Sequence, residues 1–529
     1  MLALVSLAAP AVAQTSQAVT LDAPAVFDPK LDDGSGGHAS LTLTSATTAT
    51  KGGGNVTATL TVEDAQGNPV RNFPSSAQAA GSTWTTSWDG TSDAGQTVAP
   101  GSYVFQLAVQ GDVNGSAQRT VNVVRLGARA IAFQDAGVRV PIAYHATNGT
   151  PRSYFAIDSA GDHWSLPLGA TDGALDDASG NGLAAPAPWS ALGTPPTDSN
   201  GAVLARGRAF PVAYPVNTTT LHAQLTLGDT AVNADGSTAS AGYPVQGVDI
   251  RVSAGGAPSG PISPGAQPTI EVAASLPGAL TKAPLVVALR FECNDGSGWR
   301  PVPGQQTATL TLYTLLAQAQ TADHSNAATA DAREQPFVAA LDEVAGWASR
   351  TAVASPADAL ALVTRTVNGG KGLTYDVVSG APAYADGDPG TPSLAFSEFL
   401  QGEARGKTVN CADCAALVGV YSRTVGVDVQ SAILVSDFRL NYIKGIGSTQ
   451  WKKAIFSFGG DSFSFHAVAT VDAGATIYDA CLAVDDGPHP EKNETRVEAL
   501  PLAMPFAHYM SKLTPDSFTI QELGRPTQN

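Results

Sequence analysis

The sequence predicts a multidomain protein with all-β sandwich modules at its N-terminal end and an α+β domain at its C-terminal end. The chain has 529 residues, too many for one hydrophobic core. Short alternating runs of apolar and polar residues, separated by Gly, Pro, Asn and Asp, fill its first part. A polar linker at residues 317–333 precedes segments in which apolar residues recur at helical spacing. The fold class therefore changes at the linker.

The first residues, MLALVSLAAPAVA (1–13), have the features of an incomplete secretory signal peptide. Ala11-Val12-Ala13 is a small-x-small cleavage pattern, and a polar stretch follows it. No later apolar run is long enough to span a bilayer. We expect a secreted or periplasmic bacterial protein that is not inserted in the membrane.

The charge balance limits the classes of partner. There are 46 acidic and 29 basic residues, which give a net charge of −17. Nucleic acids and anionic membranes bind clustered cations, so this balance argues against both as partners. We expect a protein or peptide substrate instead, and β modules that position the C-terminal domain or bind a surface or cell-wall target.

Residues 24–126 are predicted to form the first sandwich. They contain a Trp-Asp-Gly turn at 88–90 and a Pro-Gly-Ser-Tyr step at 100–103. This pattern resembles the immunoglobulin-like module of the flagellar hook-capping protein family, which implies an immunoglobulin-like sandwich and nothing about flagella. Trp88 and Tyr103 are predicted core residues, because buried aromatic rings mostly pack.

Residues 127–316 continue as β-rich sequence with frequent Pro and Gly, which predicts one elaborate sandwich or two smaller ones. Acidic glycine-rich loops at 172–177 and 233–236 suggest calcium, but neither has the spacing of a ligand loop. We interpret them as solvated turns and leave calcium open. Residues 317–333 are the linker, and 334–529 form the C-terminal domain.

Two helices are predicted to open the C-terminal domain. In the first, Phe337, Leu341, Val344 and Ala348 share one helical face. The second begins at a Ser-Pro cap at 355–356 and ends at the glycines 369–370.

A third helix is predicted to begin at Cys411. One apolar stripe of this helix contains Cys411, Cys414, Ala415, Val418, Tyr421 and Val425. A helix N-terminus lowers the pKa of a thiol and supplies N–H groups that can stabilise an oxyanion. Cys411 is therefore the predicted nucleophile, and Asn410 is a predicted oxyanion or support residue.

A thiolate nucleophile needs a base, and the base needs an orienting group. His466 lies in an alternating strand at 463–471, whereas His489 and His508 lie outside any clear strand. The chain then turns near residues 473–474.

The length of that turn decides which residues share a face. A loop of two or four residues pairs His466 with Cys481 and places Asp479 diagonally on the same face as His466. A loop of three residues would place His466 and Asp479 on opposite faces.

The combined pattern resembles the transglutaminase-like superfamily. It consists of a cysteine at a helix start, Ala, Arg and Gly four, twelve and fifteen residues later, then a strand His and an Asp in the next strand. The resemblance covers about residues 356–484 and implies a papain-like α+β fold with a catalytic helix packed on an antiparallel sheet. It assigns Cys411 as nucleophile, His466 as general base and Asp479 as orienting residue.

Two positions and one segment depart from the family. The aromatic residue expected two positions after the histidine is Val468 here, whereas the aromatic before the aspartate is kept as Tyr478, a predicted support residue. The segment 438–453 is an insertion, and we expect either a rim or lid over the cleft or a plain loop.

The other cysteines have alternative interpretations. Cys414 is predicted to be a core residue or the disulfide partner of Cys481, since an exported compartment permits a bridge. Cys293 is interpreted as structural. Zinc binding by Cys411, Cys414, Cys481 and His466 is an alternative, but the Cys-x-x-Cys unit lies within one helical turn and lacks a second pair. We assign no metal and no cofactor.

The functional hypothesis is an exported cysteine-dependent acyl-transfer enzyme. It would act on protein glutamine or peptide amides through a thioester on Cys411. One alternative is a cysteine peptidase or amidase that uses the same triad, for example on cell-wall peptide. The other is a catalytically silent adhesive or binding protein.

Overall fold

The computed structural model describes residues 19–48, 54–134, 143–145, 151–153, 164–167, 211–319 and 338–528, apart from gaps at 32, 34, 36, 125, 228–229, 233–237, 241–246, 263–267, 318, 387–392, 401–404, 458, 493, 518 and 526. The predicted signal peptide, both acidic loops, Phe337 and most of the linker lie outside the described residues. In the part that is described, no helix is long and apolar enough to cross a membrane.

The chain divides into two compact units, which we describe separately. The first consists of Met1–Arg129, Leu225–Glu271 and Ala288–Thr307, and the second of Ala130–Gln224, Val272–Val287 and Ala308–Asn529.

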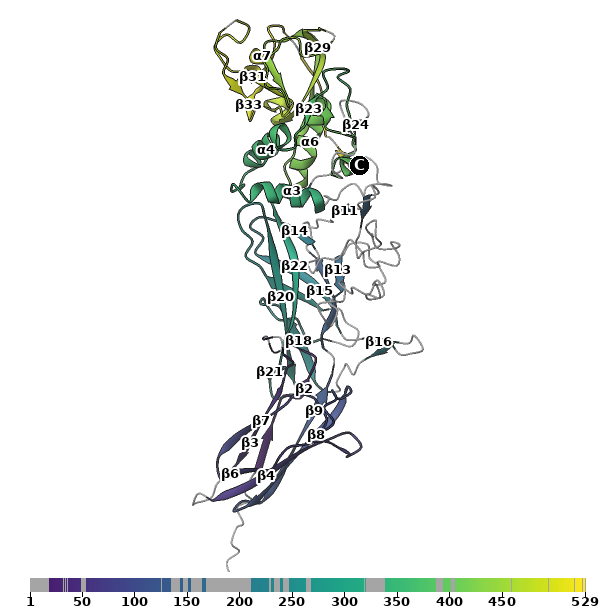
Figure 1. Ribbon diagram of the computed structural model, residues 1–529. Helices are drawn as coiled ribbons and strands as arrows, with labels where there is room; N and C mark the ends of the chain where they lie inside the picture. Colours follow the sequence, from purple (N-terminus) through teal and green to yellow (C-terminus); the bar gives the residue numbers. More distant parts are fainter. Residues whose placement is uncertain are drawn as a thin grey trace, which may run out of the picture. The chain divides into compact units, whose positions relative to one another are not determined.

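Two sheets form the N-terminal module of the first unit (Figure 1, purple). One has the strand order β1 (Val19–Asp22), β3 (Leu41–Thr47), β7 (Thr83–Trp88). The other has the order β2 (Val26–Phe27), β9 (Gly115–Val123), β8 (Gly101–Gly111), β4 (Asn55–Glu63), β5 (Pro69–Asn72), with β6 (Ser76–Ala79) paired to β4. Buried and exposed residues alternate along β3 and β4, as expected of sheets that each cover one side of a core.

The core of this module is built around Trp88. Its ring lies 5.8 Å from Tyr103 and 5.3 Å from Phe105 between centroids, and its indole N–H donates to Thr91 O at 2.9 Å. The Tyr103 hydroxyl donates to Ala99 O at 2.8 Å. Both predicted core residues are buried, and that prediction is confirmed.

The middle of the chain is also rich in strands. They are β10 (Ala128–Gln134), β11 (Ala143–His145), β12 (Pro151–Ser153), β13 (Trp164–Pro167), β14 (Pro211–Pro215), β15 (Thr220–Leu227), β16 (Thr230–Val232), β17 (Thr238–Ser240), β18 (Asp249–Ser253), β19 (Thr269–Ala273), β20 (Thr281–Asn294), β21 (Trp299–Pro301) and β22 (Gln306–Leu315). Strand β20 pairs with β18 and β21, and β14 runs parallel to β22. Cys293, on β20, is buried, and this burial raises the pKa of its thiol.

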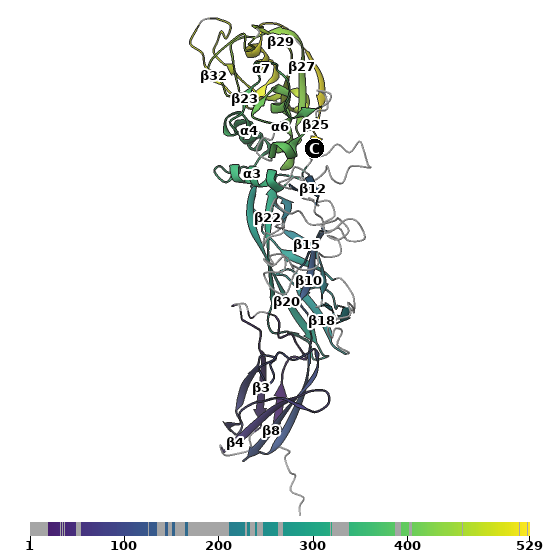
Figure 2. The ribbon, with the colours of Figure 1, turned by 45° about the vertical axis from the view of Figure 1, so that its right-hand side comes forward.

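The C-terminal part of the second unit mixes helices and sheets (Figures 1 and 2). Its helices are α3 (Val338–Ala348), α4 (Pro356–Arg365), α5 (Phe396–Leu400), α6 (Cys411–Thr424) and α7 (Phe506–Leu513). The main sheet is antiparallel, with the order β33 (Met504–Pro505), β30 (Thr476–Tyr478), β29 (Ser462–Val471), β27 (Gln430–Arg439), β34 (Thr519–Gly524). Three smaller sheets pair β23 (Thr374–Tyr375) with β26 (Thr408–Val409), β25 (Ser393–Leu394) with β24 (Ala385–Asp386) and β35 (Thr527–Gln528), and β31 (Leu482–Asp485) with β28 (Ile443–Gly445) and β32 (Glu498–Ala499).

The two opening helices lie where the sequence predicts them. In α3, Leu341, Val344 and Ala348 are buried. Helix α4 has Pro356 as its first residue, and the Ser355 side chain accepts from the Asp358 N–H. A π-helical turn, Thr366–Gly370, continues α4 to the predicted glycines.

Helix α6 differs from its prediction. The sequence predicts one apolar stripe, but every residue of α6 except Ala412 is buried. The reason is that α6 packs against α3, α4, β25 and β29, so no side of it is left to solvent (Figure 2).

Candidate functional site

The N-terminus of α6 is fixed by a reciprocal cap. Asn410 Oδ1 accepts from the Asp413 N–H at 3.1 Å, and Asp413 Oδ2 accepts from the Asn410 N–H at 2.9 Å. Asn410 Nδ2 donates to Gly380 O at 3.0 Å. The Asn410 side chain is therefore engaged at both ends, which suits it to support Cys411 rather than to donate to an oxyanion.

Asp413 ties this helix end to a neighbouring loop. Its carboxylate also accepts the N–H groups of Ala383, Tyr384 and Ala385 at 2.7–2.8 Å. Asp413 is fully buried, so these bonds replace the water that the charge loses. Cys411 follows directly on the cap as the first helical residue, with its side chain buried.

Two backbone donors lie beside the thiol. The first N–H groups of a helix have no partner within the helix. The N–H groups of Cys411 and Ala412 donate to no residue that the structure describes. Donors of this kind can stabilise negative charge that develops on a carbonyl oxygen attacked by Cys411.

The hairpin between β29 and β30 has the predicted register over three residue pairs, but β30 ends at Tyr478, so the predicted pair of His466 with Cys481 is not formed. The pairs are Val471 with Thr476, Thr470 with Ile477 and Ala469 with Tyr478, around a four-residue loop at 472–475. Asp479 follows β30 directly, and its Oδ2 lies 3.0 Å from Nε2 of His466. The prediction that the two side chains share a face is confirmed.

Four donors surround the Asp479 carboxylate. Oδ1 accepts from the N–H groups of Cys481 at 2.7 Å and Leu482 at 3.1 Å. Oδ2 accepts from His466 and, at 2.7 Å, from the hydroxyl of Tyr509 on α7. Tyr509 was not among the predicted site residues, and its only signal in the sequence is a place on the buried face of an amphipathic helix.

His466 is fully buried between Asp479 and Cys411. Its Nδ1 has no well-aligned hydrogen bond to any residue in the described part of the chain. Burial disfavours the imidazolium, but the charge of Asp479 and the contacts with Asp479 and Cys411 outweigh it and raise the pKa of His466 to about 10. Asp479 therefore orients the imidazole through Nε2, and the ring is also in contact with Cys411.

Both faces of β29 are covered around the histidine. Successive residues of the strand alternate between its two faces, and His466 and the four residues that follow it are all buried. Helix α6 packs on this strand, and α7 contacts the neighbouring β30, so neither side of the histidine meets solvent.

The remaining site residues lie close by without joining the triad. Tyr478 is buried, and within the described residues it has no hydrogen bond to His466 or Asp479. Cys414 and Cys481 are buried free thiols in contact with each other, so the predicted disulfide is not formed in this structure. Their hydrogen bond lowers the pKa of Cys414, but burial and the charge of Asp413 outweigh it, so the net shift is upward.

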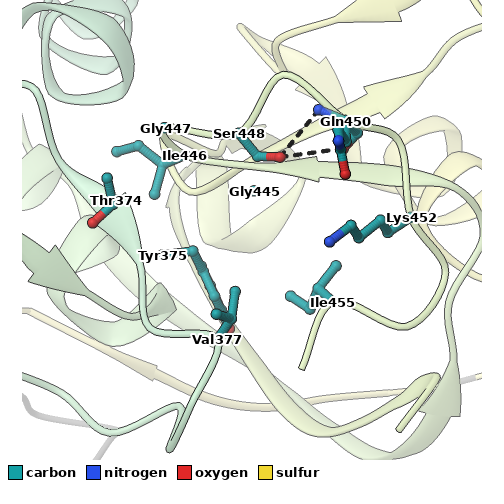
Figure 3. A pocket seen from close by; sticks show the side chains of 10 residues that line it. All are labelled: Thr374, Tyr375, Val377, Gly445, Ile446, Gly447, Ser448, Gln450, Lys452 and Ile455. Carbon is teal, nitrogen blue, oxygen red and sulfur yellow. Dashed lines mark hydrogen bonds between the residues drawn. The ribbon is translucent and has the colours of Figure 1, made fainter. Parts of the chain in front are cut away.

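The C-terminal domain contains a cavity of ≈ 250 Å³ (Figure 3). Its lining consists of Thr374, Tyr375, Val377, Gly445, Ile446, Gly447, Ser448, Gln450, Lys452 and Ile455. The segment 438–453 thus supplies part of the cavity wall. Burial and then the charges of Cys411 and Cys481 raise the pKa of Tyr375, so Tyr375 is near both. Among the described side chains, no group of three or more His, Cys, Asp or Glu is arranged to hold a metal ion.

Comparison with known proteins identifies the N-terminal module. No curated protein matches the chain. A solved structure described as "Structural insight into host cell surface retention of a 1.5-MDa bacterial ice-binding adhesin" is 12% identical, covering 57% of this chain and 99% of its own, with a TM-score of 0.16. Another, "Crystal structure of tetra-tandem repeat in extending region of large adhesion protein", is 10% identical, covering 56% and 74%, with a TM-score of 0.15. These TM-scores support no inference about fold or function. Residues 32–112 match the FlgD Ig-like domain, so the N-terminal module is immunoglobulin-like.

Proposed function

We propose that the C-terminal domain is a papain-like, transglutaminase-like enzyme that transfers acyl groups through a thioester on Cys411. The observation that carries the proposal is that His466 contacts both Asp479, through Nε2, and Cys411. We further propose that the chain is exported. The β modules would then position the catalytic domain or bind a surface or cell-wall target.

The first half of the reaction forms the thioester. Transfer of the Cys411 thiol proton to the His466 imidazole leaves a thiolate beside an imidazolium. The sulfur attacks the carbonyl carbon of a glutamine carboxamide, and the N–H groups of Cys411 and Ala412 stabilise the oxyanion. The C–N bond then breaks, His466 gives its proton to the nitrogen, and ammonia leaves.

The second half releases the acyl group. An amine attacks the thioester carbon, and His466 accepts its proton. The C–S bond then breaks, and the Cys411 thiolate is restored with a new amide as the product. If water attacks instead, the product is a carboxylate and the enzyme is a hydrolase.

The pH profile of Cys411 alkylation tests the proposal without knowledge of the substrate. Iodoacetamide is added to the full chain between pH 4.5 and 9, and carbamidomethylation at each cysteine is followed by peptide mass spectrometry. A thiolate held by His466 should react at pH 5 at a rate close to its rate at pH 8. The buried Cys293 is an internal control, because the pKa of its thiol is raised.

Two variants make the result decisive. His466→Gln and Asp479→Asn should lose the reaction at pH 5, and thermal unfolding shows whether each variant is folded. A wild-type Cys411 whose rate simply rises with pH, like that of an ordinary thiol, would exclude the enzyme and favour a binding protein.

The acyl acceptor is tested with N,N-dimethylcasein and dansylcadaverine. Ammonia release with incorporation of the dansyl label indicates transfer. Ammonia release without incorporation indicates an amidase, and cleavage of the casein chain indicates a peptidase.

A further inference from the structure

We propose that the cavity beside Cys411 is a substrate subsite that binds a carboxylate-bearing residue of an acyl-donor peptide, with Lys452 as its cationic partner. The identification of the bound peptide as an acyl donor rests on the proposed function. The binding of an acidic peptide at this place can be measured without turnover.

Backbone contacts place the cavity at the reacting end of α6. Tyr375 pairs with Val409, two residues before Cys411, and the Asp376 N–H donates to Val409 O at 2.8 Å. The Tyr375 ring stacks on Phe463 at 6.5 Å, and the Phe463 ring lies 5.6 Å from that of His466. A peptide residue in the cavity would thus be near the site of attack.

The two walls of the cavity are held together. The Tyr375 N–H donates to Ile446 O at 3.0 Å, and the Ile446 N–H donates to Cys481 O at 2.8 Å. Gly447 has φ +74, and a Cβ there would lie 2.7 Å from Leu373 O, so this close approach of backbones needs glycine. The cavity is therefore a fixed feature of the wall around the triad.

Its size favours one peptide residue over a whole small ligand. A volume of ≈ 250 Å³ is smaller than usual ligand pockets, which hold about 300–1,000 Å³. Much of the wall is apolar, from Tyr375, Val377, Ile446 and Ile455, and Val377 at the rim is 40% exposed. Such a wall can hold the methylene groups of a side chain.

The charge of the cavity selects an anion. Lys452 is the one charged side chain of the lining, and Figure 3 shows its ammonium group directed into the cavity. It has no side-chain hydrogen bond or ion pair with a residue in the described part of the chain. Its backbone is held by bonds in both directions with Ile443 at 3.0 Å.

Two neighbouring lysines, unlike Lys452, have side-chain partners within the chain. Lys444 pairs with Glu498, and Lys453 lies over the Tyr442 ring at 5.3 Å. A single ammonium without an arginine fork suits one carboxylate, because lysine acts as a point charge. The chain has a net charge of −17 and as a whole repels anions. A lysine without a protein partner at the cavity would therefore attract an acidic substrate residue to this one place.

Calorimetric binding of peptides to the full chain carrying Cys411→Ala tests the subsite. The probes are seven-residue peptides with a central Gln and a Glu at each other position in turn, each with a matched Gln-for-Glu peptide. One Glu position should bind about three- to fivefold more tightly than its match, as expected of a single partly exposed ion pair. This preference should weaken in 0.5 M NaCl.

Lysine variants locate the preference. Lys452→Gln should abolish it and Lys452→Glu should reverse it, whereas Lys453→Gln, the neighbouring lysine outside the cavity lining, should keep it. Equal binding of all matched pairs, or a preference that survives Lys452→Gln, overturns the subsite. A preference at Lys452 in a protein whose Cys411 fails the alkylation test would retain the subsite and reject the enzyme.

Discussion

Nε2 of His466 lies 3.0 Å from Oδ2 of Asp479, across a hairpin turn. Tyr509 and two backbone N–H groups also donate to the Asp479 carboxylate. These bonds prevent the carboxylate from rotating away from the imidazole. The ring is thereby held in one orientation, in contact with Cys411. Four variants and one pH series test this arrangement.

Asp479→Asn keeps the shape of the side chain and removes its charge. The pKa of His466 should fall, because the charge of Asp479 is the main cause that raises it. We expect the rate of thioester formation to fall by roughly 10²–10⁴, as in other triads without their carboxylate. Dansylcadaverine incorporation or ammonia release measures the change, and an unchanged rate would contradict the triad.

Tyr509→Phe removes one donor to Asp479 and leaves the aromatic ring in place. The free energy of unfolding should decrease by about 1 kcal/mol, the usual net value of one hydrogen bond. The reactivity of Cys411 at pH 5 should also decrease, since the carboxylate is less firmly held. Tyr103→Phe is the matched control: it loses a hydroxyl bond in the N-terminal module, to Ala99, and should leave Cys411 unaffected.

Asn410→Ala removes the cap of α6. The cost should be about 1 kcal/mol of stability, as for other capping residues. Cys411 should react more slowly as well, because the same residue fixes the helix start that carries the thiol. Ser355→Ala removes the cap of α4 and should cost similar stability without a loss of reactivity. Equal reactivity in both variants would show that Asn410 only stabilises the fold.

The stability of the C-terminal domain should depend on His466 at alkaline pH. Its pKa is raised from 6.5 to about 10 in the folded chain, so the folded state binds the proton more tightly than the unfolded state. This stabilisation is fully present below pH 6.5 and is lost as the pH rises to 10, at up to about 1.4 kcal/mol per pH unit. Melting temperatures at pH 6.5, 8 and 10 should show a steeper decline for the wild type than for His466→Gln. Parallel curves would contradict a protonated His466.

Much of the site follows from local rules of the sequence. The cap pattern at Asn410 places Cys411 at a helix start, and the two-residue period of strands makes His466 and Asp479 cofacial for an even loop. Tyr509 and Tyr375 were missed because they reach the site from elements 30 or more positions away in the chain. The burial of α6 on every side was missed for a similar reason: a stripe pattern reports one packed face and not how many neighbours the helix has.

The Cys411 side chain is only 3% exposed, and that of His466 is fully enclosed. A reactive sulfur outside the cell meets peroxide and other oxidants, which convert exposed thiolates to sulfenic and then irreversibly oxidised acids. An enclosed sulfur is shielded from such oxidants by the side chains packed around it. If the chain is exported, as proposed, the packing that buries Cys411 would therefore prolong the working life of the protein in an oxidising medium.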